Sequence, residues 1–179
     1  MRSLDRPIAL KTAESAIDNV GVTEVGENRG PSIELYQQSC VPPLQPGAPW
    51  CAAFVRYRMR QAAHSLGLTY DTTFPRSGWT PDWARWAREN NKWLPVSEAR
   101  NNHQVIRKGD LALFWFEGLG RIGHIGIIVS ANSKGLSIVE GNTSDPNADG
   151  VDRDGDGVYL KRRSWSALGK FGGVLMVDF

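Results

Sequence analysis

The pattern of apolar and polar positions divides the chain into a helical first part and a strand-rich second part. Four segments in the first part repeat apolar residues at helical spacing and are predicted helices: 7–20, 31–36, 50–66 and the segment that begins at Thr80-Pro81-Asp82. From Leu111 onward the pattern is that of strands, and five are predicted: 111–116, 123–131, 136–141, 157–163 and 172–178. Short turns between most of these strands favour antiparallel pairing. Helices followed by strands predict an α+β domain in which the N-terminal helices pack on an antiparallel sheet.

Side-chain spacing within the predicted helices indicates which positions are buried. The first helix has a stripe of four residues that we expect to face the core: Ala13, Ala16, Ile17 and Val20. In helix 50–66, three arginines are expected on a solvated face: Arg56, Arg58 and Arg60. Three tryptophans near the fourth helix have helical spacing, which favours core packing over a platform for stacking on sugar rings: Trp79, Trp83 and Trp86.

One cysteine stands where a thiol can act as a nucleophile. Cys51 follows a segment, 40–49, whose four prolines exclude helix and central strand, and it lies in the first turn of helix 50–66. A helix N-terminus offers unpaired N–H groups and a partial positive charge, both of which stabilise a thiolate. Cys51 is therefore the candidate nucleophile of a cysteine hydrolase. The other cysteine, Cys40, is expected to be a free thiol, because two cysteines do not make a disulfide scaffold and pairing them would silence the nucleophile.

Three histidines compete for the role of the base that takes the thiol proton. His64 follows the cysteine by thirteen residues on the same predicted helix, about 20 Å away along the axis at 1.5 Å per residue. His103 lies in a polar, loop-like run. His124 is flanked by Gly123 and Gly126, which we expect to leave room for a neighbouring helix. His124 is therefore the predicted base.

An acid and an amide on a later strand are candidates for orienting the imidazole. Glu140 and Asn142 are two residues apart, so in a regular strand both side chains point to one face. The register of the hairpin between the two strands decides whether that face is the one that carries His124, and the turn alone does not fix this register. Either side chain could then accept the imidazole N–H and set its tautomer.

Four blocks of the sequence strongly resemble, in order, the CHAP family of cysteine, histidine-dependent amidohydrolases/peptidases: Trp-Cys-Ala-Ala-Phe-Val (50–55), Gly-Asp-Leu-Ala-Leu-Phe (109–114), Gly-His-Ile-Gly-Ile-Ile-Val (123–129) and Glu-Gly-Asn-Thr (140–143). The resemblance runs from about residue 21 to residue 179. It implies a papain-like fold and the hydrolysis of amide bonds in bacterial peptidoglycan. By this resemblance Cys51 is the nucleophile, His124 is the base, and Glu140 and Asn142 hold the imidazole, with Glu140 as the main orienter.

The expected mechanism is a thiolate attack on an amide carbonyl, which needs no metal and no organic cofactor. The backbone N–H of Cys51 is the expected donor to the oxyanion, with a second donor from the upstream segment. Three residues are the candidates for binding substrate: Trp50, Tyr36 and Gln37.

An aspartate-rich segment, 149–157, resembles the opening of a calcium loop, with Asp-x-Asp-x-Asp-Gly at residues 152–157. The twelfth position counted from Asp152 is Arg163, where an EF-hand needs a bidentate glutamate. A hairpin loop is therefore favoured, and an accessory ion at Asp152, Asp154 and Asp156 stays open.

Composition limits the remaining function classes. The net charge of +2 is too small to indicate a nucleic-acid partner, and no run of about 18 apolar residues predicts a membrane span. The N-terminal residues 1–7 lack the apolar stretch and cleavage site of a standard secretory signal. We therefore expect synthesis in the cytoplasm and action in the cell wall or periplasm after release or injection.

A length of 179 residues fits one domain, so we expect a single CHAP-like catalytic domain over 1–179 with residues 1–20 as an N-terminal helical extension. We also expect a monomer. The favoured function is a peptidoglycan endopeptidase or N-acetylmuramoyl-L-alanine amidase, acting as an endolysin, an autolysin or an antibacterial toxin, and a toxin would have an immunity protein as a partner. The alternatives are a papain-like hydrolase of other amides and a catalytically idle wall-binding module.

Overall fold

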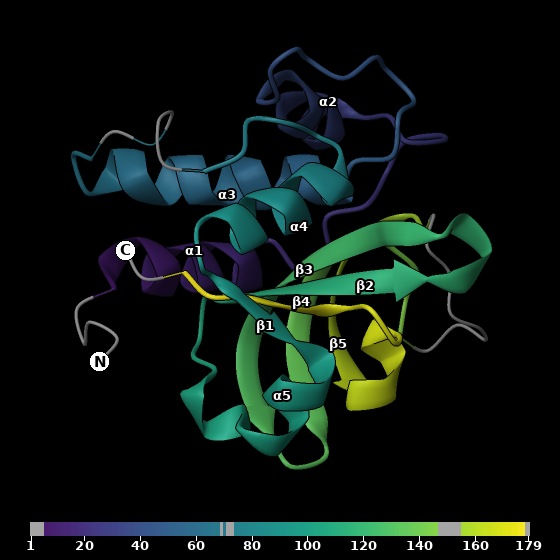
Figure 1. Cartoon of the computed structure of the whole chain (residues 1–179). Coiled ribbons are helices and arrows are strands. Elements are labelled where there is room, and N and C mark those ends of the chain that lie inside the picture. The colour runs from purple at the N-terminus through teal and green to yellow at the C-terminus, as the bar shows by residue number, and fades with distance from the viewer. Residues whose placement is uncertain (1–5, 69, 71–73, 147–154, 178–179) are drawn as a thin grey trace.

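A computed structural model of the chain describes residues 6–68, 70, 74–146 and 155–177 (Figure 1). The helices are α1 (Pro7–Ile17), α2 (Pro31–Gln38), α3 (Cys51–Ser65), α4 (Thr80–Glu89) and α5 (Val96–Asn101). The strands are β1 (Trp93–Pro95), β2 (Leu111–Phe116), β3 (Arg121–Asn132), β4 (Gly135–Thr143), β5 (Gly157–Ser164) and β6 (Gly173–Leu175). The strands form one sheet in the order β1-β6-β2-β3-β4-β5, and neighbouring strands are antiparallel. This arrangement confirms the predicted α+β class with N-terminal helices packed on an antiparallel sheet.

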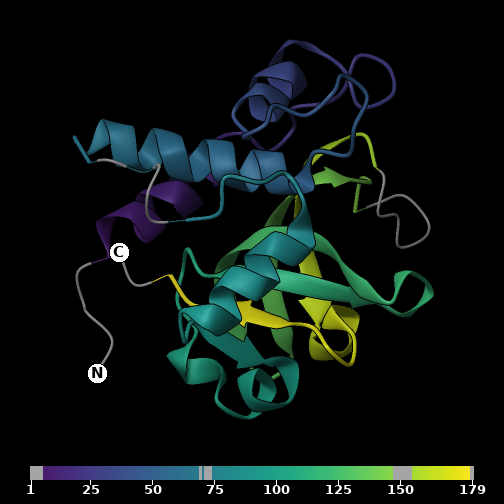
Figure 2. The ribbon, with the colours of Figure 1, turned by 45° about the horizontal axis from the view of Figure 1, so that its top comes forward.

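The sheet is covered on both faces by apolar side chains, because the residues of each central strand alternate between two cores. Ile125 and Ile127 of β3 belong to the larger core, which also contains the buried faces of α1, α3 and α4. Ile128 of β3 and Phe114 of β2 belong to the smaller core, where α5 and the short 3₁₀ helix Trp165–Leu168 pack. Figure 2 shows α1 and α3 together on the helical side of the sheet. None of the helices in the described ranges combines the length and apolarity needed to cross a bilayer.

The first helix is shorter than predicted, and this changes its buried stripe. α1 ends at Ile17 and the chain turns back at Gly21, where φ is +94°. Ala13 and Ala16 are fully buried against α3, as expected. Ile17 and Val20 were wrongly placed on the stripe: both are exposed, Ile17 as the last residue of the helix and Val20 beyond its end.

The expectation of a solvated arginine face on α3 is wrong for two of its three members. Arg56 is only 1% exposed, and its guanidinium donates to the carbonyls of Ser39 at 2.5 Å and Pro75 at 3.3 Å. Arg58 is also buried and lies over the ring of Tyr57, 4.5 Å from its centroid. Helical spacing could not reveal this, since the partners of the Arg56 guanidinium, and the Ser15 hydroxyl that Arg58 Nη1 contacts at 3.3 Å, lie in other segments of the chain.

The hydrophobic pattern did not predict two short elements. β1 has three residues and α5 has six, which is too few for either period to be recognised. Both elements follow α4 and complete the edge of the sheet, since β1 pairs with β6. Of the three tryptophans near α4, Trp83 is fully buried and Trp86 packs partly against the same core, as the spacing indicated.

Candidate active site

Cys51 is the first residue of α3 and its thiol is free. The preceding loop, 41–49, passes beside it and forms one wall of a cleft of about 640 Å³ whose lining includes the cysteine. At this position the N–H groups of the first helical turn have no partner within the helix, so the sulfur lies beside partial positive charge. The thiol therefore lies at a helix N-terminus, the position that the sequence predicted, and it also lines a cleft.

His124, on β3, and Glu140, on β4, are joined by a hydrogen bond. His124 Nε2 lies 3.0 Å from Glu140 Oε2, and both side chains are buried. A carboxylate can only accept, so Nε2 carries the proton of this bond. The second ring nitrogen, Nδ1, is buried without a partner of hydrogen-bonding geometry in the described part of the chain. Nδ1 is therefore the nitrogen that remains for the Cys51 thiol.

Arg163, on β5, holds the other side of Glu140. Its Nε donates to Glu140 Oε1 and its Nη2 to Glu140 Oε2, both at 2.8 Å. This is the two-pronged geometry that makes arginine–carboxylate pairs strong and directional. The guanidinium also lies over the ring of Phe114, which in turn contacts His124 with ring centroids 5.3 Å apart. The arginine, the carboxylate and the imidazole thus form one buried chain of contacts.

Sequence reasoning did not assign Arg163 to this site. It considered the residue only as a misfit in a calcium loop. The sequence does show that Arg163 lies two residues beyond Lys161 on a predicted strand, so that both side chains are expected on one face of the sheet. This spacing does not name Glu140 as the partner, because Arg163 pairs in register with Leu136 and reaches Glu140 only along the sheet.

The charges in this chain of contacts set the protonation of its members. Burial raises the pKa of Glu140, but hydrogen bonds from Arg163 and His124 outweigh it and lower the pKa to about 2. Burial lowers the pKa of His124, but interactions with the Cys51 thiol and with Glu140 outweigh it and raise the pKa to about 9. At neutral pH Glu140 is therefore ionised, and the site favours an imidazolium at His124.

Two irregularities in the sheet lie beside these residues. The pairing of β2 with β3 shifts next to His124, between its partner Phe114 and Trp115, and the pairing of β4 with β5 shifts between Glu140 and Thr143. Such bulges redirect side chains, and they are frequent next to active sites. Asn142 lies within the second shift, with a left-handed φ of +57°. The simple alternation that placed Glu140 and Asn142 on one face is therefore interrupted.

Asn142 binds the start of α3, the helix that carries Cys51. Its Oδ1 accepts the backbone N–H of Trp50 at 2.8 Å, and its Nδ2 donates to Asn28 Oδ1 at 3.0 Å and to the carbonyl of Gly155 at 3.1 Å. Because Trp50 directly precedes Cys51, this amide ties β4 to the first turn of α3. The side chain that accepts a hydrogen bond from His124 is therefore Glu140, while Asn142 binds the start of the helix that carries the sulfur.

The glycines around the base do not act as expected. A Cβ at Gly126 would lie 2.5 Å from Ile138 Cγ2 and 2.9 Å from Glu140 Cγ, so this glycine makes room for the neighbouring strand. A Cβ at Gly123 would meet Phe116 at 2.8 Å. The residue that makes room for the helix is Gly141, whose Cβ would lie within 2.8 Å of side-chain atoms of Trp50 and Phe54.

The three residues expected to bind substrate are buried in the protein core instead. Trp50 and Tyr36 pack against each other with ring centroids 5.6 Å apart, and Trp50 Nε1 donates to Glu24 Oε1 at 2.6 Å. Gln37 Nε2 donates both of its hydrogens, to the carbonyls of Asn28 at 3.0 Å and Ala48 at 2.8 Å. None of the three side chains lines the cleft. This geometry gives no support to the substrate-binding assignment of Trp50, Tyr36 and Gln37, because an aromatic or amide side chain near Cys51 also suits the core behind it.

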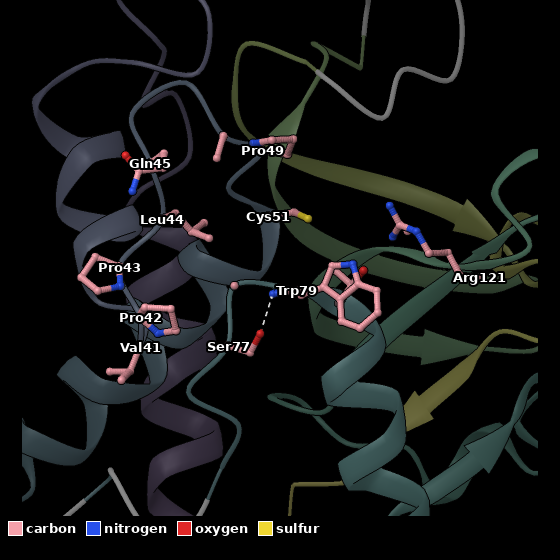
Figure 3. A pocket seen from close by; sticks show the side chains of 14 residues that line it. Val41, Pro42, Pro43, Leu44, Gln45, Pro49, Cys51, Ser77, Trp79 and Arg121 are labelled. Carbon is pink, nitrogen blue, oxygen red and sulfur yellow. Dashed lines mark hydrogen bonds between the residues drawn. The ribbon is translucent and has the colours of Figure 1, made fainter.

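The cleft is lined by residues that sequence reasoning did not select. Figure 3 shows the loop residues Val41–Leu44 on one side of the cleft and Trp79 with Arg121 on the other, with the Cys51 sulfur directed toward the latter. Trp79 is 51% exposed, unlike the other two tryptophans near α4. It directly precedes α4 rather than lying within it, so the helical spacing that predicted core packing does not apply to it.

The remaining candidates lie away from the cleft or outside the described residues. His64 is exposed near the end of α3, and His103 is in a 3₁₀ turn. Cys40 is a buried free thiol, and burial raises its pKa to about 11. Of the aspartates in the calcium-like segment, those at 149, 152 and 154 fall outside the described residues. Within the described ranges, no group of three acidic, histidine or cysteine side chains is placed to hold a metal ion.

Comparison with known proteins identifies the family. The family model described as the CHAP domain matches residues 44–142, more than half of the 179-residue chain. This span includes Cys51, His124, Glu140 and Asn142, whereas Arg163 lies beyond it. Comparisons with curated proteins and with solved structures gave no match. The chain belongs to the CHAP family, which is papain-like in fold and generally hydrolytic, with amidase or peptidase activity.

Proposed function

We propose that this protein hydrolyses amide bonds of bacterial peptidoglycan with Cys51 as the nucleophile and His124 as the general base. One observation carries the proposal: a cleft-lining thiol at a helix N-terminus interacts with an imidazole whose Nε2 is bound by a buried carboxylate. This is the nucleophile, base and orienter arrangement of cysteine hydrolases. Family membership supports peptidoglycan as the substrate.

The reaction follows from the positions of the atoms. Transfer of the Cys51 thiol proton to His124 Nδ1 gives a thiolate–imidazolium pair, the state that the raised pKa of His124 favours at neutral pH. The thiolate sulfur attacks the amide carbonyl carbon, so that a C–S bond forms and negative charge develops on the carbonyl oxygen. The backbone N–H of Cys51 is the proposed donor to this oxyanion. The imidazolium then protonates the leaving amine as the C–N bond breaks. Water attacks the thioester with His124 as base, which releases the acid and restores the thiol.

The supporting residues act through position and charge. Glu140 fixes the ring and stabilises the imidazolium that forms during attack, and Arg163 keeps Glu140 ionised and in place. Asn142 is proposed to position the nucleophile through Trp50, rather than to hold the imidazole. These assignments divide the predicted catalytic set into reacting groups, Cys51 and His124, and positioning groups, Glu140 and Asn142.

Digestion of purified sacculi tests the proposal. We expect the wild-type protein to release new amino groups without new reducing sugar ends, because the described site is built for acyl transfer and not for glycoside cleavage. Cys51→Ala, which removes little volume, is the matched inactive control. If the main product has new reducing ends, or if no amino groups are released from sacculi while casein is clearly cleaved, the protein belongs to another class of hydrolase. Mass analysis of the products separates peptide cleavage, which we favour, from cleavage at the muramoyl amide.

The biological setting follows from the substrate. Peptidoglycan lies outside the cytoplasmic membrane, so on this proposal the enzyme acts in the cell wall or periplasm after release or injection. An endolysin, an autolysin and an antibacterial toxin all fit that site of action. If the protein is a toxin, the producing cell needs an immunity protein that blocks the cleft or covers Cys51.

A further inference from the structure

The cleft in front of Cys51 has an uneven chemical character. Most of its wall is apolar, made by residues of the 41–49 loop and by the exposed face of Trp79. Arg121, the first residue of β3, is the only charged side chain among its lining residues in the described part of the chain. No aspartate or glutamate lines the described cleft. A substrate that places a negative charge beside Arg121 therefore meets attraction and no opposing charge.

Arg121 is held in place and still has donors to offer. It is partly buried, and its Nη1 donates to the carbonyl of Ile122 at 3.0 Å. Its guanidinium carbon lies 6.0 Å from the centroid of the Trp79 ring. A guanidinium has five N–H donors in a planar fork, and the bond to Ile122 is its only hydrogen bond among the described residues. The remaining donors match the geometry of a carboxylate.

The Ile122 carbonyl joins the two segments that form this side of the cleft. It accepts a hydrogen bond from Arg121 and a second one, at 2.9 Å, from Thr80 Oγ1 at the start of α4. Thr80 directly follows Trp79, so the residue next to the indole and the guanidinium of Arg121 share one backbone acceptor. Figure 3 shows both side chains on the side of the cleft toward which the Cys51 sulfur points. The pair is thus a fixed part of the cleft wall and not a solvent-exposed arginine at a distance.

We propose that Arg121 is a specificity residue that binds a carboxylate of the peptide substrate while Cys51 attacks a nearby amide. This inference rests on the proposed function and adds a preference to it. The stem peptides of peptidoglycan carry free carboxylates, which some walls convert to amides. The free acid offers Arg121 a charged acceptor for two parallel hydrogen bonds, whereas the amide is neutral and brings donors of its own. The enzyme therefore prefers stems with free carboxylates to amidated stems.

The test uses a matched pair of disaccharide-tetrapeptides, one with free stem carboxylates and the other with those groups amidated. The measured quantity is the ratio of kcat/KM for the acid to kcat/KM for the amide. Because both substrates meet the same enzyme preparation, the ratio does not depend on the fraction of enzyme that is folded. A charge-assisted pair in a partly open cleft gives a wild-type ratio of about ten or more. Arg121→Gln should reduce the ratio to near one, and Arg121→Lys should retain part of it, because lysine keeps the charge and loses the fork.

Two controls separate this inference from the proposed function. Lys134→Gln removes one positive charge from the exposed β3–β4 turn and should leave the ratio unchanged. Calorimetric binding of the same two compounds to Cys51→Ala, with and without Arg121→Gln, measures the preference without hydrolysis. If Cys51→Ala binds the acid more tightly than the amide, and this preference disappears with Arg121→Gln, the inference is supported. It is supported even if the wild-type protein cleaves neither compound, because that failure would count only against the proposed function. A ratio that is the same in wild type and Arg121→Gln, a preference for the amide, or an absence of binding by both compounds would overturn the inference.

Discussion

Replacing Glu140 by glutamine should destabilise the fold by an amount that depends on pH. Glutamine has nearly the size of the carboxylate and approximates its neutral form, so the variant loses what ionisation contributes. Glu140 is fully buried, and its pKa falls from the ordinary value of 4.5 to about 2. At 1.36 kcal/mol per pKa unit, this change corresponds to about 3 kcal/mol of folding free energy near neutral pH. The raised pKa of His124 reflects in part the same hydrogen bond, so this interaction is included only once in the folding free energy.

The sign of the pH dependence follows from the direction of the shift. A carboxyl with a lowered pKa contributes its full stabilisation above the unfolded value and loses it as pH falls through the folded value. The difference between wild type and Glu140→Gln should therefore be about 3 kcal/mol at pH 6 and roughly half of that at pH 3. Urea unfolding at the two pH values measures it, with Glu89→Gln at the exposed end of α4 as the matched control. A difference below about 1 kcal/mol at pH 6, or an equal one at both pH values, would refute the reasoning.

Further predictions concern the reacting groups. A small haloacetamide near neutral pH should label Cys51 and spare Cys40, whose thiol is buried with a raised pKa, as peptide mapping would show; preferential labelling of Cys40 contradicts the assignment. His124→Ala should lower kcat/KM by several orders of magnitude and His64→Ala should not, with native circular dichroism in both; near-normal activity of the first variant excludes His124 as the base. The pH profile of kcat/KM should fall on the alkaline side near the His124 pKa of about 9, and Glu140→Gln should move that limb to lower pH, since burial then acts on the imidazole without the carboxylate. EDTA should leave turnover intact, and a calcium-reversible loss of turnover would show that an ion takes part.

The positions of the candidate nucleophile and base could be predicted because each has a local signal. Cys51 follows a proline-rich loop at the start of a helix, and His124 remained after His64 was excluded by distance along that helix and His103 was assigned to a polar loop. The order of helices and strands likewise predicted the sheet and its antiparallel pairing. These features depend on residues close together in sequence, which is where hydrophobic patterns are informative.

The rest of the site depends on contacts between distant segments. Nothing near Arg163 indicates that it binds Glu140, since the contact crosses from one strand to the next and runs along the sheet. The bulge at Asn142 interrupts the alternation by which its direction was inferred. Gln37 belongs to the core rather than the cleft because carbonyls of the loops on either side of α2 accept its hydrogens. Burial of this kind is set by tertiary packing and cannot be inferred from spacing.

The amide of Asn142 has a consequence for how this protein can change. It joins β4, which also carries Glu140, to the start of the helix that carries Cys51, and neither Asn142 nor Glu140 lines the cleft. The walls of the cleft come largely from the 41–49 loop and the segment just before α4, which are connecting segments. Reactivity and substrate choice are thereby carried by separate parts of one small chain. Exchanging the 41–49 loop for another of similar length should change which peptidoglycan substrates are cleaved. The rate at which a small thiol reagent modifies Cys51 should stay nearly constant.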